Sequence, residues 1–223
     1  MRSIFMAAVV ACLVVTLMPV WAGQGGNFRE RFVDQRVNDL KEKLALTDAQ
    51  VVKIREMYTA QFEKMREQMQ NQGQQNPGGM RGAQTRMTQL LREKVVPVLD
   101  PDQVKRYADM LAKEATDQAA AVIASVREKL GLAEDAWTKL EPELKKLADL
   151  KAELTAKSDI ARAQLRQLVE EKKDDAKAIG EKLKALDAIK KDLTAKIDEQ
   201  REKIRKAVTE SQWAQLVLDG AVD

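Results

Sequence analysis

Side chains that commonly carry catalysis are scarce in this chain. It has no histidine, and Cys12 is the only cysteine among its 223 residues. Histidine is the usual general base and the commonest metal ligand, so both kinds of site lose their main candidate. The acidic pair Asp174–Asp175 lies in a highly charged stretch typical of a protein surface, and no Gly-rich phosphate-binding lysine motif is present. We therefore expect no enzyme, no cofactor and no metal site.

Methionine side chains are the first candidates for a binding function. Methionine is flexible and polarizable, and it recurs on surfaces that bind several partners. The first half of the chain holds a cluster of them: Met57, Met65, Met69, Met80, Met87 and Met110. Core packing suits those on the apolar stripe described below. Met57 and Met80 lie off that stripe, so they are the better candidates for contact with a polypeptide client.

Basic side chains are the second candidates. Residues 53–94 hold eight Lys and Arg against four Glu. This excess suits a solvated face, or alternatively a basic concave face that attracts acidic, unfolded clients before apolar contact forms. In the second interpretation Arg81, Arg86 and Arg92 contact the client.

The overall charge is balanced. Residues 23–223 carry 37 Lys and Arg (38 less Arg2) against 35 Asp and Glu, a net of +2. The chain also has few aromatic residues, with two Tyr, four Phe and three Trp. It therefore lacks both the positive field and the aromatic stacking surface that a nucleic-acid-binding protein needs. Its abundance of Leu, Ala, Glu, Lys and Gln, with few β-branched runs, predicts an all-α protein.

The first 22 residues have the composition of a secretory signal. Arg2 is followed by an apolar run at 4–18, which is shorter than the roughly 20 residues of a membrane span. The segment Val20-Trp21-Ala22 predicts cleavage after Ala22. Export without a cysteine in the mature chain suits the periplasm. An uncleaved anchor and lipid attachment at Cys12 remain alternatives.

A short motif marks the expected helix starts. In Thr47-Asp48-Ala49-Gln50 the threonine hydroxyl accepts from the amide three residues on, and the glutamine side chain accepts from the threonine amide, which is a capping box. The pattern recurs at Asp100–Gln103, with Pro at the first helical position, and at Thr209–Gln212. A degenerate copy with alanine at both capping positions occupies 133–136. The boxes form two pairs, and each pair encloses a long apolar-periodic stretch.

The first pair encloses a predicted antiparallel hairpin. Residues 71–79 have the Gly, Asn and Pro content of a turn. Facing residues of a hairpin have a constant index sum, and Phe62–Leu90 and Ile54–Val98 both sum to 152, which places the reversal near 76. The two stripes are Val51, Ile54, Tyr58, Phe62, Met65 and Met69, then Ala83, Met87, Leu90, Val95 and Val98.

The second pair encloses a longer predicted hairpin. Its index sums are 347 or 348, as for Leu168–Ile179 and Leu144–Ile204. The reversal is expected at 173–175, where Asp174 or Asp175 would act as N-cap. One uninterrupted helix over about 134–207 is the alternative. The stripes are Leu140, Leu144, Leu147, Leu154, Ala161, Leu165 and Leu168, then Ile179, Leu183, Leu186, Leu193, Ile197, Ile204 and Val208.

The two hairpins predict a tandem duplication. After the signal, 23–116 form the first helical unit and 117–223 the second. A single helix over 101–130 could join them, with Gly131 as a C-cap. The arm 133–174 is twelve residues longer than the arm 47–76, which adds roughly 18 Å. Two extended, coiled-coil-like hairpins are therefore expected.

The paired boxes resemble the Leu-Thr-x-x-Gln motif of the Spy/CpxP-like periplasmic family, which uses it twice per four-helix unit. Leu46–Gln50 matches fully, Leu99–Gln103 has Asp for Thr, and Val208–Gln212 has Val for Leu. The copy at 132–136 departs at both capping positions. The resemblance covers essentially the whole mature chain as two tandem units. It implies an extended, cradle-like fold in which these residues start helices: Thr47, Gln50, Asp100, Gln103, Thr209 and Gln212.

Members of that family are envelope-stress proteins. The resemblance implies an exported, ATP-independent periplasmic chaperone that binds unfolded or partly folded envelope proteins through amphipathic and Met-rich faces, as a monomer or dimer. One alternative is a regulatory or structural hairpin adaptor for a specific envelope partner, such as a sensor-kinase domain. A metal-responsive sensor is a further alternative, disfavoured by the lack of His and Cys in the mature chain.

Overall fold

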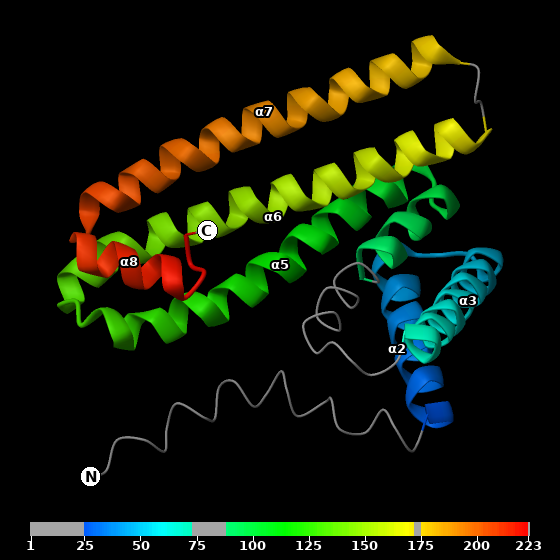
Figure 1. Ribbon diagram of the computed structural model, residues 1–223, viewed down its shortest axis with the longest axis horizontal. Coiled ribbons are helices and arrows are strands. Elements are labelled where there is room, and N and C mark those ends of the chain that lie inside the picture. The colour runs from blue at the N-terminus through cyan, green and yellow to red at the C-terminus, as the bar shows by residue number, and fades with distance from the viewer. Residues whose placement is uncertain (1–24, 73–87, 172–174, 223) are drawn as a thin grey trace. The chain divides into compact units, whose positions relative to one another are not determined.

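The computed structural model describes residues 25–72, 88–171 and 175–222, and every regular element in these ranges is helical (Figure 1). The predicted all-α class is confirmed. The expected signal at 1–22 and the expected reversal near 76 lie outside the described residues. Among the described helices, none combines the length and apolar composition that crossing a bilayer requires.

The helices form two compact units. In chain order the elements are α2 (Gly25–Leu44), α3 (Asp48–Gln72), the helical residues 88–95, the 3₁₀ turn η1 (Val96–Val98), α5 (Pro101–Leu130), α6 (Glu134–Glu171), α7 (Ala176–Ala207) and α8 (Glu210–Leu218). Of the described residues, 25–42 and 46–72 belong to unit 1, and 43–45 and 88–222 belong to unit 2. The expected boundary between 116 and 117 falls inside α5.

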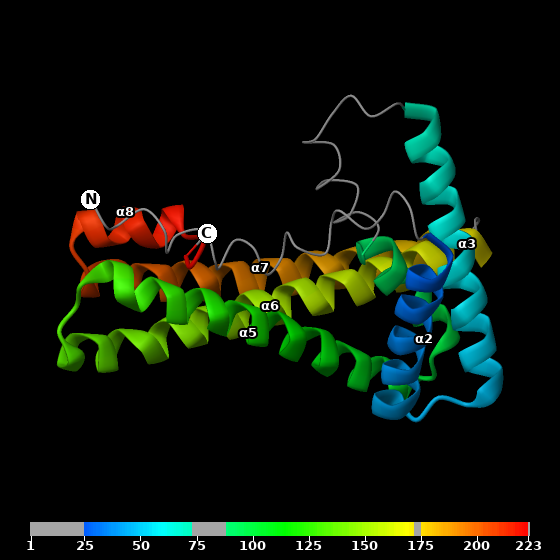
Figure 2. The same cartoon turned by 90° about the horizontal axis from the view of Figure 1, so that it is seen from below.

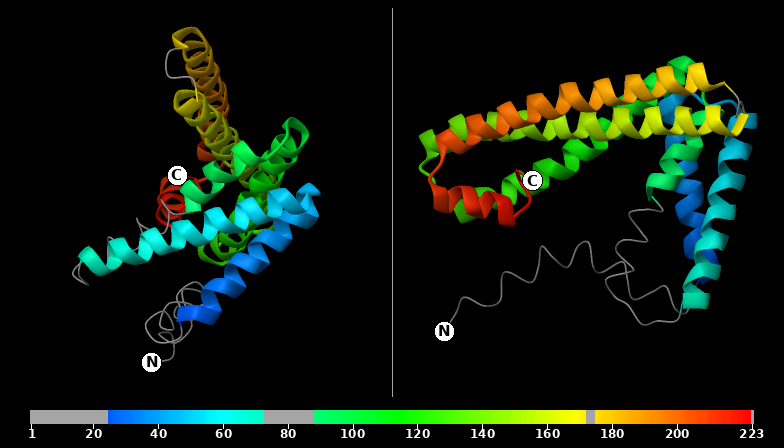
Figure 3. Two further views of the ribbon diagram at one scale, coloured as in Figure 1. Left: turned by 90° about the vertical axis from the view of Figure 1, so that its right-hand side faces the viewer. Right: turned by 45° about the horizontal axis from the view of Figure 1, so that its top comes forward.

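Unit 1 is an antiparallel pair of helices, α2 and α3, which Figures 2 and 3 show joined at one end. The rings of Phe32 and Phe62 meet edge to face with their centroids 5.6 Å apart. Arg55 of α3 forms an ion pair with Asp34 of α2 at 3.0 Å. The buried apolar residues of this unit recur at helical spacing, as that of an amphipathic pair must: Val33, Val37, Leu40, Leu46, Ile54 and Tyr58.

Unit 2 is built around α6, which packs against both α5 and α7 (Figure 1). Its core includes Leu144 and Leu147 of α6, Ile204 of α7 and Leu216 of α8, each with no exposed surface. The helix α8 and the buried Val222 cover the end of the hairpin where α6 begins. That end therefore has several helices around one apolar core.

The second predicted reversal is confirmed. α6 ends at Glu171, α7 begins at Ala176, and α7 runs back along α6 (Figures 1 and 3). The Asp175 carboxylate accepts from the Ala178 amide at 2.9 Å, so this aspartate is the N-cap. The alternative of one uninterrupted helix is wrong, because a capped helix start interrupts it.

The connection that follows α2 and the connection that follows α5 have the same local geometry, and their equivalent residues lie 86 positions apart. We call each of these helix-to-helix connections a corner. α2 ends at Leu44 and α5 at Leu130, and the next residue of each is left-handed: Ala45 at φ +52° and Gly131 at φ +59°. Lys41 bridges the first corner to Asp48, as Arg127 bridges the second to Glu134. These matched details support the expected duplication.

Under the expected duplication, the helix α5 would belong to both repeats. Its last part corresponds to α2 through the corner, and its first part corresponds to α8 with a shift of 109 residues. Under that shift Tyr107 matches Leu216 and Val95 matches Ile204, and all four are fully buried. In that duplication, the closing helix of the first repeat would be continuous with the opening helix of the second, since α5 is one helix. This continuity explains why the compact units do not divide at 116/117.

Candidate binding surfaces

Three of the four capping boxes form as expected. Each N-cap amide donates to its glutamine Oε1 at 2.9 to 3.0 Å, and each glutamine amide donates back to the N-cap side chain at 2.8 to 3.3 Å. The residues are Thr47 with Gln50, Asp100 with Gln103, and Thr209 with Gln212. At the degenerate box only the backbone bond from the Trp137 amide to the Ala133 carbonyl begins the helix. The helix-start interpretation of these six residues is confirmed.

Two of these glutamines make a second bond that the motif did not predict. Gln103 Nε2 donates to the Ala45 carbonyl at 3.3 Å, and Gln212 Nε2 donates to the Leu130 carbonyl at 3.4 Å. Carbonyls at a helix C-terminus have no partner within the helix. The glutamine NH₂ group donates to such a carbonyl while the glutamine oxygen accepts from the N-cap amide. An ionised glutamate could only accept, because its side chain has no donor. The preference for Gln over Glu is the signal that sequence reasoning missed.

A cluster of buried ion pairs joins residues 88–95 to α6. Arg166 Nη1 lies 2.7 Å from Glu93 Oε2, and Arg92 Nη1 lies 3.9 Å from Asp159 Oδ2. Arg162 reaches the other Asp159 oxygen at 3.5 Å. The two carboxylate residues are only 4% and 5% exposed, whereas the arginines are partly exposed. We refer to these five residues as the ion-pair cluster.

Burial dominates the electrostatics of the cluster. Desolvation raises the pKa of Asp159 above its usual value, Arg92 and Arg162 oppose this rise, and Glu93 adds to it. The neighbouring Ser158 hydroxyl is also buried without a hydrogen-bond partner among the described residues. The cluster fixes the position of 88–95 on α6, since removing one partner would strand a buried charge. Sequence reasoning missed it, because Asp159 lies in an apolar-rich segment where a buried charge was not expected.

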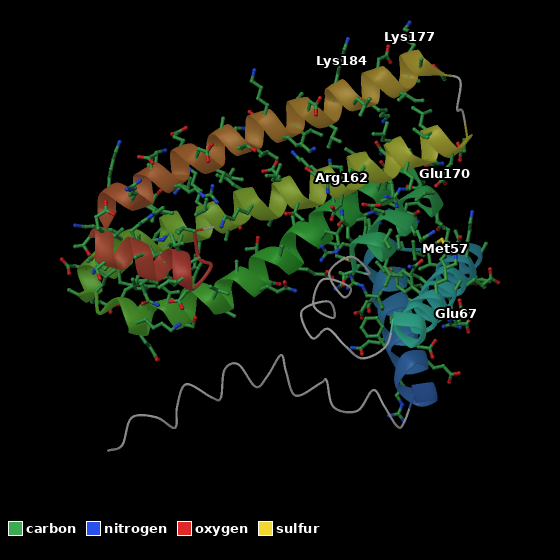
Figure 4. The ribbon with its side chains drawn as sticks, viewed as in Figure 1. Met57, Glu67, Arg162, Glu170, Lys177 and Lys184 are labelled. Carbon is green, nitrogen blue, oxygen red and sulfur yellow. The ribbon has the colours of Figure 1, made fainter. Side chains whose placement is uncertain are left out.

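The five residues proposed for client contact have different outcomes. Met57 lies half-buried on α3 (Figure 4), which leaves part of it available. Arg92 is engaged in the ion-pair cluster, so it is a structural cation in the described chain. Met80, Arg81 and Arg86 lie outside the described residues, and their role stays a prediction.

Among the described residues of the α6–α7 hairpin, the exposed large apolar side chains lie near the end where the chain reverses. We call residues 134–154 with 192–207 its proximal half, and 155–171 with 176–191 its distal half. Val169 is 42% exposed and Leu183 is 45% exposed in the distal half, whereas Leu144 and Ile204 of the proximal half have no exposed surface. Leu165, Leu168 and Ile179 are half-buried. The distal half is therefore one described surface suited to an apolar ligand, alongside the exposed Phe32 and Val52 of unit 1.

The described side chains form no evident catalytic arrangement. A groove of about 160 Å³ between α5 and α6 is lined mainly by alanines, including Ala119 and Ala152. No group of three Asp, Glu, His or Cys among the described residues is placed to hold a metal ion. No family model, curated protein or solved structure matches the chain.

Proposed function

We propose that this protein is an ATP-independent chaperone of the cell envelope, exported after cleavage near Ala22 and related to the Spy/CpxP-like family. It holds unfolded or partly folded polypeptides on exposed apolar surfaces and releases them without a nucleotide-driven step. The matched corners and the three reciprocal capping boxes support the relationship.

One observation carries the proposed activity: the half-exposed apolar side chains of the distal hairpin. Burying a large apolar side chain away from water contributes about 1.5 to 3 kcal/mol of favourable free energy. Val169 and Leu183 forgo part of that gain in the isolated chain. A partly apolar surface with no defined pocket favours weak binding of many polypeptide sequences over tight binding of one ligand.

Aggregation of unrelated denatured proteins tests this function. Residues 23–223, which retain every described helix, should slow light scattering by several chemically or thermally unfolded proteins without ATP. Buffer and an unrelated helical protein of equal mass are the controls. Protection of none would reject the chaperone and favour the adaptor for one specific envelope partner.

A further inference from the structure

The distal half of the hairpin also carries unneutralised positive charge. Residues 176–191 of α7 hold five lysines against two carboxylates, a net of +3. In the described part of the chain, none of these lysines has a carboxylate oxygen within 4.0 Å. Lys182 instead donates to the Gln164 side chain at 3.0 Å. The remaining four are Lys177, Lys184, Lys190 and Lys191.

The proximal half of α7 is different. Residues 192–207 hold five basic side chains against four carboxylates. Four of the five have a carboxylate within 4.0 Å, among them Lys196 with Asp192 at 2.8 Å and Lys203 with Glu199 at 2.6 Å. The free positive charge of this helix is therefore concentrated where its apolar side chains are exposed.

Apolar and cationic groups occur on the same turns of distal α7, where Leu183 stands between Lys182 and Lys184 in the sequence. Leu168, Ala178 and Ala185 line a shallow groove, with Glu181 and Lys182 beside them. Lys177 and Lys184 project from α7 on the side away from α6 (Figure 4). We call the groove together with Val169, Leu183 and these two lysines the distal surface.

The charge identifies the occupant. A second copy of the same surface would bring two sets of free lysines together, which is repulsive. A membrane surface requires a broad apolar face to bury in the headgroup region, whereas this surface has only two large exposed apolar residues. A carboxylate-bearing polypeptide complements the lysines, and its apolar side chains fit the groove.

We propose that the distal surface binds segments of non-native protein in which apolar side chains are flanked by Asp or Glu. The lysines draw in the segment through long-range attraction, and contact with Leu168, Val169 and Leu183 then holds it. This proposal rests on the chaperone function and specifies its client class.

Peptide binding tests the proposal. Two short fluorescent peptides share the same leucine positions, and glutamates in one are replaced by lysines in the other. The full mature chain should bind the glutamate peptide more tightly, and added salt should weaken that binding. The Lys177→Glu/Lys184→Glu double variant and Leu183→Ser should each weaken it roughly tenfold.

Matched variants control for charge and for exposed apolar area. Lys139→Glu/Lys146→Glu changes two exposed lysines of proximal α6 with the same spacing of seven, and Leu218→Ser removes an 80% exposed leucine of α8. Both should bind like the unmodified chain. Equal loss in the control variants, equal affinity for the two peptides, or competition by anionic vesicles at the same lysines would overturn the proposal.

The aggregation assay separates this inference from the function on which it rests. If the unmodified chain protects clients and the distal variants protect them equally well, the distal surface is wrong and the chaperone stands. If the chain protects none but binds the glutamate peptide through Leu183, the surface stands and the chaperone fails. Far-ultraviolet circular dichroism verifies that every variant remains helical.

Discussion

The proximal and distal halves of the α6–α7 hairpin have the same apolar repeat but opposite surroundings. In the proximal half, α5, α8 and Val222 complete a core in which Leu144 and Ile204 are fully buried. In the distal half Leu183 keeps 45% of its surface exposed, and ion pairs join α6 to residues 88–95. The apolar stripe thus predicts which residues face the partner helix of the hairpin. Whether those residues are fully buried depends also on a further element packed over the two helices.

The largest difference should appear in stability. Leu144→Ala removes a side chain with no exposed surface and should lower the free energy of unfolding by about 2 to 5 kcal/mol. Leu183→Ala removes one that is 45% exposed and should cost less than about 1 kcal/mol. Urea unfolding followed by circular dichroism measures both. Equal losses would mean that the distal half is as well packed as the proximal half.

A smaller effect should follow at the proximal corner. Gln212→Glu keeps the acceptor for the Thr209 amide but removes the donor to the Leu130 carbonyl, and it should destabilise by about 1 kcal/mol. Glutamate near a helix N-terminus is itself favourable, so the loss would have to come from the lost donor. Gln212→Ala, which also opens the box, should lose more. A stabilised Gln212→Glu variant would show that the bond to Leu130 contributes nothing.

The smallest effect concerns pH in the distal half. Because burial raises the folded-state pKa of Asp159, the folded chain binds this proton more readily than the unfolded chain does. The resulting stabilisation is complete below the unfolded value of about 3.8 and is lost as pH rises through the folded value. Asp159→Asn should remove this dependence, with Arg92, Arg162 and Glu93 still in place. Urea midpoints of both chains across acid to neutral pH provide the measurement, and parallel curves would contradict it.

Much of the fold could be predicted from sequence because the signals are local. A capping box such as Thr209–Gln212 is decided by four consecutive residues, and the reversal at Asp175 is decided by one N-cap. The sequence was compatible with one continuous helix over 101–130 but did not require it. No Gly or Pro that would end a helix stands between its two parts.

The candidate surfaces were harder to predict because they depend on distant neighbours. Arg92 appears in sequence as one of several surface cations, and only the approach of Asp159 from α6 makes it structural. Leu183 belongs to the same predicted stripe as Leu193, yet Leu183 is 45% exposed and Leu193 only 3%. Lys177 and Lys184 were not distinguished from the paired lysines nearer the end of α7.

Amide hydrogen exchange along α7, with and without the glutamate peptide, tests the division of the hairpin most directly. Without peptide, the amides of 192–207 should exchange more slowly than those of 176–191. The proximal half can unfold only when the apolar core of unit 2 unfolds with it. With peptide, added protection should appear in 165–169 and 177–185 and nowhere in α8. Uniform exchange along α7, or protection gained only in the proximal half, would contradict a distal client surface.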